Sequence, residues 1–306
     1  MARSRFIKDT GLTVRMTTVM FLLGALFVAI VVSLIYIFPP QYAPLLGIAG
    51  LAVAFYQWWS SDKVAMRAMR AREVSPEEAP ELHGMIDRLC ALADMPKPRV
   101  GIADMAVSNA FATGRSPDRA VVCVTTGILQ TLDAEELEAV LAHELSHVAH
   151  RDVLVMTVAS SAGIVAGMLM HGARFGALAG RRDRNSAAFF MITLVVSLVV
   201  YAISFFATKL LSRYRELSAD RSGAYLTGRP SALASALTKI TGEMSAIPQR
   251  DLRSAQSMNA FFIAPAVTGV SWRTLTSTHP SLEQRLDQLA RISAELGRPY
   301  DGPVPH

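Results

Sequence analysis

The residues best suited to carry out a reaction are gathered in one short motif, His143-Glu144-Leu145-Ser146-His147. On a helix, the two histidines lie four residues apart on one face, so both imidazoles can reach the same metal ion. Zn²⁺ takes about four nitrogen, sulfur or oxygen ligands and, in catalytic sites, leaves one position for water. Glu144 can accept the proton of that water as it attacks a carbonyl. The motif predicts a zinc-dependent hydrolase; the alternative is a solvated helix face that happens to hold two histidines.

The residues around the motif predict the helix that it needs. Asp133 is a suitable N-cap, and Glu136 three residues later completes the pattern of a capping box. The apolar residues that would bury one side of this helix are Val140, Leu141, Leu145 and Val148. Short strands are expected at 99–104, 107–113 and 119–125, and an earlier helix is expected to begin at Ser75. Together these elements predict a small sheet beside the helix that carries the histidines.

Two histidines do not complete a zinc site, so a third ligand is required. Glu216, in the run YRELSAD, is the strongest candidate, and Asp220 shares its helix face. One carboxylate would then bind the metal while the other receives the Nδ1–H of a ligand histidine. The alternative is an exposed charged helix whose arginines pair with these acids, and the spacing leaves both interpretations open. Cys90 and Cys123 are far apart, which excludes a disulfide framework and a cysteine zinc site.

The elements that position this chemistry belong to an unusually apolar chain. Of its 306 residues, 51% are hydrophobic and only 18% are charged, with a mean hydropathy of +0.32. Soluble domains carry about 25% charged residues, so the deficit argues against an ordinary cytosolic protein and points to lipid. The apolar excess lies in four segments, 17–38, 42–59, 153–173 and 187–211.

These segments suggest a division of the chain into four parts. The parts are a tail with a transmembrane hairpin (1–59), a segment with the helix that carries the two histidines (60–152), a second apolar hairpin (153–211) and a segment with the candidate third ligand (212–306).

The basic residues indicate how the chain is oriented in the membrane. They flank the first hairpin on both outer sides and are absent from its loop at 39–41, which places both flanks in the cytoplasm. The loop of the second hairpin carries four arginines and one aspartate, which opposes spanning. We still expect it to span, and partial entry into the bilayer is the alternative. The two histidines before this hairpin and Glu216 after it must bind the same ion, so the hairpin crosses the membrane twice or not at all. The orientation of the first hairpin then places the site at the cytoplasmic face. Because the net charge of +5 follows the membrane ends, no nucleic-acid binding is expected.

Six features, in this order, resemble the HtpX-type membrane zinc metalloproteases, relatives of the CAAX prenyl protease. They are the N-terminal hairpin, NAFA at 109–112, HELSH at 143–147, two apolar segments, RELSAD at 215–220, and THP at 278–280 followed by Arg285. The resemblance covers most of the chain. It implies an α-helical multi-span membrane protein with an α+β zincin-like protease domain, in which Glu216 is the third zinc ligand and Asp220 stands behind it.

The resemblance also implies roles near the substrate. His279 would lie by the metal, where it can stabilise an oxyanion; alternatively it forms only a turn ahead of the next helix. Asn109 and Ala110 would lie on an edge strand beside the substrate, to which an extended peptide can add as a further strand. The sequence equally allows this strand to be internal. Arg285 would either bind a substrate carbonyl or brace its own helix by pairing with a nearby acidic residue.

The sequence thus predicts a membrane-bound zinc endopeptidase with one Zn²⁺ per chain. We expect it in a bacterial-type cytoplasmic membrane, hydrolysing peptide bonds at the cytoplasmic face in stress response and in quality control of misfolded or damaged membrane proteins. Its expected partners are protein substrates and the lipid bilayer, and the oligomeric state is left open. The alternatives are a catalytically silent scaffold with a structural metal, or a CAAX-type protease that processes prenylated proteins. A structural zinc needs no general base, so Glu144 favours catalysis.

Overall fold

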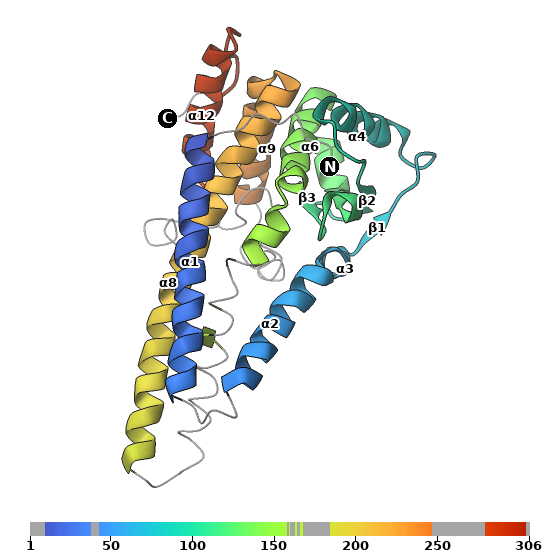
Figure 1. The fold of residues 1–306 in the computed structure, drawn as a ribbon. Helices are drawn as coiled ribbons and strands as arrows, with labels where there is room; N and C mark the ends of the chain where they lie inside the picture. Colours follow the sequence, from blue (N-terminus) through green and yellow to red (C-terminus); the bar gives the residue numbers. More distant parts are fainter. Residues whose placement is uncertain are drawn as a thin grey trace. The chain divides into compact units, whose positions relative to one another are not determined.

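The computed structural model describes residues 10–37, 43–157, 159, 163, 166–167, 184–246 and 279–303. The chain forms two compact units: unit 1 contains Met1–Thr13, Trp59–Val153 and Ser212–His306, and unit 2 contains Val14–Trp58 and Leu154–Leu211. The helices and strands are α1 (Thr10–Ile37), α2 (Ala43–Trp59), α3 (Ser61–Ala68), β1 (Ala71–Glu73), α4 (Pro80–Ala93), β2 (Arg99–Ala103), β3 (Ala110–Thr113), η1 (Pro117–Arg119), β4 (Val121–Thr125), α5 (Thr126–Thr131), α6 (Ala134–Ala149), α8 (Arg184–Thr227), α9 (Pro230–Ala246) and α12 (Leu282–Glu295) (Figure 1). Every residue of the predicted site belongs to unit 1.

Unit 1 contains a four-stranded sheet with the order β1-β2-β4-β3. β2 and β4 pair in parallel, while β1 and β3 are antiparallel to their neighbours. β4 is fully buried, as its sequence VVCVT predicts for a central strand. Among the strands in the described residues, β3 pairs with β4 alone and lies at the end of the strand order. For this part of the chain, the structure favours an edge position over the internal one that the sequence also allows.

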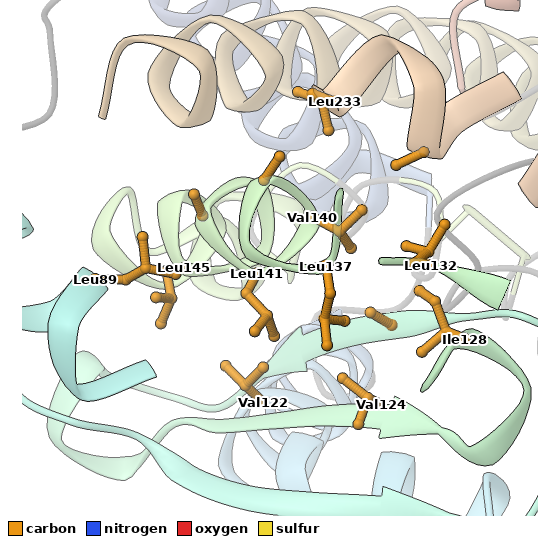
Figure 2. Close-up of a cluster of buried hydrophobic side chains, with 14 of the residues drawn as sticks. Leu89, Val122, Val124, Ile128, Leu132, Leu137, Val140, Leu141, Leu145 and Leu233 are labelled. Atoms are coloured by element: carbon orange, nitrogen blue, oxygen red, sulfur yellow. The ribbon is translucent and has the colours of Figure 1, made fainter. Parts of the chain in front are cut away.

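The helix α6 lies at the centre of the hydrophobic core of unit 1. It packs on β3, β4, α4 and α9, and Figure 2 shows Leu141 facing Val122 of the sheet while Leu233 of α9 lies across the other side of the helix. All four apolar residues predicted to face the core are buried. The capping box also forms: the Asp133 side chain accepts from the backbone N–H of Glu136, and the Glu136 side chain accepts from the backbone N–H of Asp133. The helix expected from the sequence is confirmed.

The helix predicted to begin at Ser75 begins later, at Pro80. Glu78 does accept a hydrogen bond from the Ser75 backbone, as a capping box requires, but this contact closes a separate turn. Proline lacks the N–H that a helix interior uses and favours the first helical position, so α4 starts there. The Glu78 carboxylate also receives a hydrogen bond from Arg72, which holds the turn against β1.

The first two predicted apolar segments form the helices α1 and α2, and the fourth forms the first half of α8. Among the described residues, one stretch, Leu194–Thr227, is both long and apolar enough to cross a membrane, with a mean hydropathy of 2.1 over its most apolar 18 residues. Only 17% of that window is buried, so most of its apolar side chains face outward, as lipid contact requires. Most of segment 153–173 and the loop after it lie outside the described residues. The observed architecture is mostly helical with a small sheet, and the multi-span arrangement stays a prediction.

Candidate metal centre

The two histidines of the motif project from α6 on one side of the core helix. Their Nε2 atoms lie 3.2 Å apart, and their rings meet edge to face with centroids 4.8 Å apart. His143 is fully buried and His147 is nearly so. Packing against the sheet on one face and α9 on another fixes α6, and the four-residue spacing then fixes both imidazoles.

α8 brings Glu216 to the same point. Its Oε1 atom lies 3.5 Å from His147 Nε2 and its Oε2 atom lies 3.7 Å from His143 Nε2. The ligand atoms of the three residues all lie within 4.8 Å of one another. A tetrahedral ion with ligand bonds of about 2.0–2.1 Å separates neighbouring ligand atoms by about 3.3–3.4 Å. Two imidazoles and a carboxylate at these separations fit a small dication such as zinc.

A second carboxylate and an arginine stand behind His143. The Asp220 Oδ1 atom lies 2.9 Å from His143 Nδ1, the ring nitrogen on the far side from Glu216. Arg285 of α12 donates from Nε and Nη2 to both oxygens of Asp220, at 2.7 and 2.6 Å. Arg285 is only 3% exposed and does not line the cleft. It therefore anchors Asp220, which differs from both expected roles, a substrate contact and the bracing of its own helix, because its Nε and Nη2 atoms donate to a buried carboxylate of α8.

His147 has a matching pair of neighbours that the sequence did not single out. The Asp152 Oδ2 atom lies 2.5 Å from His147 Nδ1, and the Arg215 Nε atom lies 2.8 Å from the same carboxylate oxygen. In the sequence, the arginines of this run are expected only as partners for acids on their own helix. The available signal was weak: an aspartate five residues after the second histidine, and an arginine directly before Glu216.

The charges of the cluster shift its protonation equilibria. Although burial disfavours the imidazolium form, hydrogen bonding and charge from Asp220 and Glu216 outweigh it and raise the pKa of His143 to about 9. Burial alone would raise the pKa of Glu216, but His279, His143 and His147 hold it well below its ordinary value. The negative potential that stabilises a protonated histidine also attracts a dication, which would replace that proton on binding.

Glu144 occupies the cleft beside these ligands. It is 5% exposed, and burial raises the pKa of its carboxyl group despite the opposing influence of His143 and His147. A backbone hydrogen bond from Ala112 of β3 favours its ionised form. A buried carboxyl group whose pKa is raised above its ordinary value is better suited to accept and return a proton.

The cleft itself has a volume of about 100 Å³. Its walls are β3 with the following turn, the end of α6, and α8, and they include Ala110, Glu144, Arg151 and His279. The His279 Nδ1 atom lies 3.0 Å from Glu216 Oε2. Asn109 is fully buried away from the cleft, and its backbone N–H and C=O are bound to Thr125. Of the predicted strand residues, Ala110 thus reaches the cleft and Asn109 secures the strand.

A glycine allows α6 and α8 to approach closely enough to form the centre. A Cβ atom at Gly223 would lie 2.9 Å from the His143 backbone nitrogen and 3.2 Å from its Cα. Any other residue would separate the two helices or distort them. Nothing local in the sequence marks this glycine, since the constraint comes from a helix 80 residues away along the chain.

Comparison with known proteins decides the family. Residues 76–293 match the model of peptidase family M48. The chain belongs to this family. It is 54% identical over 306 residues to "Protease HtpX homolog 1" of Streptomyces coelicolor, covering 99% of both chains. It is 48% identical over 296 residues to a "Protease HtpX homolog" of Moorella thermoacetica, covering 96% of this chain and 98% of the relative. The resemblance to HtpX-type proteases is confirmed, and this M48 chain is a protease with a membrane-type helix.

The fold also resembles a solved structure. Ste24p of S. mikatae superposes with a TM-score of 0.57 at 18% sequence identity, covering 90% of this chain. The chain spans 65% of the Ste24p chain. At this identity the likeness concerns the fold alone.

Proposed function

We propose that this M48 protease is a membrane-bound zinc endopeptidase, with His143, His147 and Glu216 as the metal ligands. The observation that carries the proposal is the placement of these three groups and Glu144 around one cleft. When bound there, zinc would supply a Lewis acid that polarises a carbonyl and makes water more acidic. Three protein ligands leave one position for water, as catalytic zinc sites do.

The remaining steps fall to the side chains of the cleft. Glu144 accepts the proton of the attacking water and passes it to the leaving amine. His279 donates to the oxygen that gains negative charge. The position of β3 at the end of the described strand order, with Ala110 at the cleft, supports binding of an extended peptide, which adds to the sheet as a further strand. Recognition through the backbone suits an endopeptidase that acts on many unfolded segments.

We further propose that the substrates are misfolded or damaged membrane proteins, cleaved at the cytoplasmic face of a bacterial-type inner membrane. The apolar face of α8 and the basic flanks of the first hairpin support this location. Processing of prenylated C-termini is less favoured, because the four apolar segments of this sequence form a small membrane portion in which to enclose a lipid-modified substrate. A silent scaffold would have no use for a buried carboxyl group such as Glu144.

The test compares purified full-length protein with its Glu144→Gln variant, both zinc-loaded in detergent, on a detergent-solubilised unfolded membrane protein and on a prenylated peptide. We expect Glu144→Gln to lose at least about 10²-fold in cleavage rate while its zinc content is unchanged. Glu135→Gln, on the exposed start of the same helix, is the matched control and should cleave normally. Cleavage by Glu144→Gln at the parent rate refutes the mechanism, and cleavage of the prenylated peptide alone refutes the substrate class.

A further inference from the structure

We propose that Asp152 and Arg215 are positioning residues of the metal centre: Asp152 orients His147, and Arg215 holds Asp152 in place. The inference rests on the proposed metal centre and adds to it a pair of residues outside the ligand set. Neither residue contacts the predicted ion directly. Both lie at the wall of the cleft, on the side of His147 that faces away from Glu216.

The geometry at His147 fixes which nitrogen is available to a metal. Its Nδ1 atom lies 2.5 Å from Asp152 Oδ2, whereas its Nε2 atom lies 3.2 Å from His143 Nε2 and 3.5 Å from Glu216 Oε1. A carboxylate at Nδ1 keeps the proton on that nitrogen, so the lone pair of Nε2 points to the metal position. It also prevents rotation of the ring about the Cβ–Cγ bond, which would withdraw the ligand atom.

Arg215 stabilises the ionised carboxylate of Asp152 in its buried position. The Asp152 side chain is 3% exposed and the Arg215 side chain is 12% exposed. An ionised carboxylate removed from water requires a partner of opposite charge, and Arg215 Nε provides it at 2.8 Å. Arg215 directly precedes Glu216 on α8, so the same turn of helix supplies a metal ligand and the anchor of a ligand histidine.

The two ligand histidines therefore have equivalent supports. Arg285 holds Asp220 against His143, and Arg215 holds Asp152 against His147. In each case an arginine from another element fixes an aspartate at Nδ1. The two arginines come from α12 and α8, and α8 takes part in both supports, because it carries Asp220 as well as Arg215.

The two residues also lie next to the points where the chain leaves unit 1 and returns to it. Asp152 lies one residue before the chain leaves this unit at Val153, and Arg215 lies three residues after it returns at Ser212. The main core, around Leu141 and Val122, is formed by other elements. Loss of the Asp152–Arg215 contact should therefore disturb His147 and Glu216 without unfolding the core.

The test measures zinc affinity in the cleavage-deficient Glu144→Gln background, using full-length protein in detergent and competition with a chromophoric chelator. Asp152→Asn should weaken zinc binding about 10–100-fold, the usual effect of removing a carboxylate that supports a ligand histidine. Arg215→Ala should weaken it as well, and Arg215→Lys, which keeps the charge, should recover part of the loss. In the double variant the two losses should not add, because both act through one contact.

Asp62→Asn is the matched control, since it removes an Asp–Arg pair of similar length, 2.7 Å, outside the cleft. It should leave zinc affinity unchanged. Parent-like zinc affinity in Asp152→Asn overturns the inference, and if that variant does not fold, parent-like affinity in both Arg215 variants overturns it instead. Failure of the parent to bind zinc at all would refute the proposed function, which keeps the two failures distinct.

Discussion

The imidazole of His279 lines the cleft beside Glu216, with its Nδ1 atom 3.0 Å from Oε2. A ring N–H at this place can stabilise charge that develops on the carbonyl oxygen under attack. We expect His279→Ala to lower kcat by about 10²–10³-fold, the loss that follows removal of one oxyanion donor. KM should change little, because the interaction forms only in the transition state. Steady-state kinetics at full zinc occupancy measures this, and His279→Gln, which keeps an N–H donor, should retain more activity than alanine.

The two cysteines give a second prediction at the scale of single residues. Burial raises the pKa of Cys90 to about 11 and that of Cys123 to about 12. Since the thiolate is the reactive form, iodoacetamide at pH 8 should modify neither thiol in the native protein and both in denaturant, as counted by mass spectrometry. The folded state favours the neutral thiols, so this contribution to stability is complete below the thiol pKa of the unfolded chain and declines as the pH rises toward 11 and 12. Labelling of the native protein at pH 8 would contradict the burial seen here.

Residues of the site differ in how far the sequence could predict them. His143, Glu144 and His147 follow from a spacing within one helix. The spacing of Glu216 and Asp220 leaves two interpretations open, and the resemblance to the HtpX-type proteases implies their roles. The sequence predicts that Arg285 contacts substrate or braces its own helix, but it pairs with an aspartate 65 residues earlier in the chain. That contact depends on how α12 meets α8, which no local pattern encodes.

At the scale of elements, the approach of α8 to α6 is limited by Gly223. Its Cβ position lies 2.9 Å from a backbone atom of His143, which cannot move aside as a flexible side chain would. We expect Gly223→Ala to lower the free energy of unfolding by about 1–3 kcal/mol, the usual cost of overpacking. It should also weaken zinc binding, because Asp220 and Glu216 lie on the displaced helix. Chemical denaturation and chelator competition measure the two effects.

The control for that substitution is Gly84→Ala on α4. Nothing lies within 4 Å of a Cβ atom at this exposed position. Alanine is the better helix former, so this variant should gain about 0.5–1 kcal/mol in stability and bind zinc normally. The same substitution of glycine by alanine should therefore change the free energy of unfolding in opposite directions at these two helical positions. A stabilised Gly223→Ala protein with parent-like zinc affinity would show that the helices do not need this contact.

The ends of helices and strands show how far local sequence patterns can predict the fold. The same sequence pattern, a short polar residue followed three positions later by glutamate, occurs at Asp133 and at Ser75. It caps α6 at the first position, whereas at the second it closes a turn because Pro80 offers a better helix start. The edge position of β3 depends on the order of strands in the sheet, which is a property of the assembled unit.

At the scale of the whole molecule, the site is built from two parts of the chain that are separated by the apolar stretch Leu154–Leu211. α8 belongs to both units: its 44 residues extend about 66 Å, more than twice the roughly 30 Å of a hydrocarbon core. Its apolar first half can therefore lie in lipid while Glu216 stays beyond it.

This arrangement leads to a topology prediction for the complete chain. If the second apolar hairpin spans the membrane, an epitope tag inserted after Gly180 lies outside the cytoplasm, whereas a tag following His306 lies inside with the site. We expect proteinase K added to intact spheroplasts to remove the first tag and spare the second, which should be lost only after lysis. Survival of a cytosolic marker protein controls for intact membranes. Protection of both tags would indicate that the hairpin enters the bilayer only partway, and external loss of the C-terminal tag would contradict a cytoplasmic site, because residues 143–147 and 216 must share one side to share one ion.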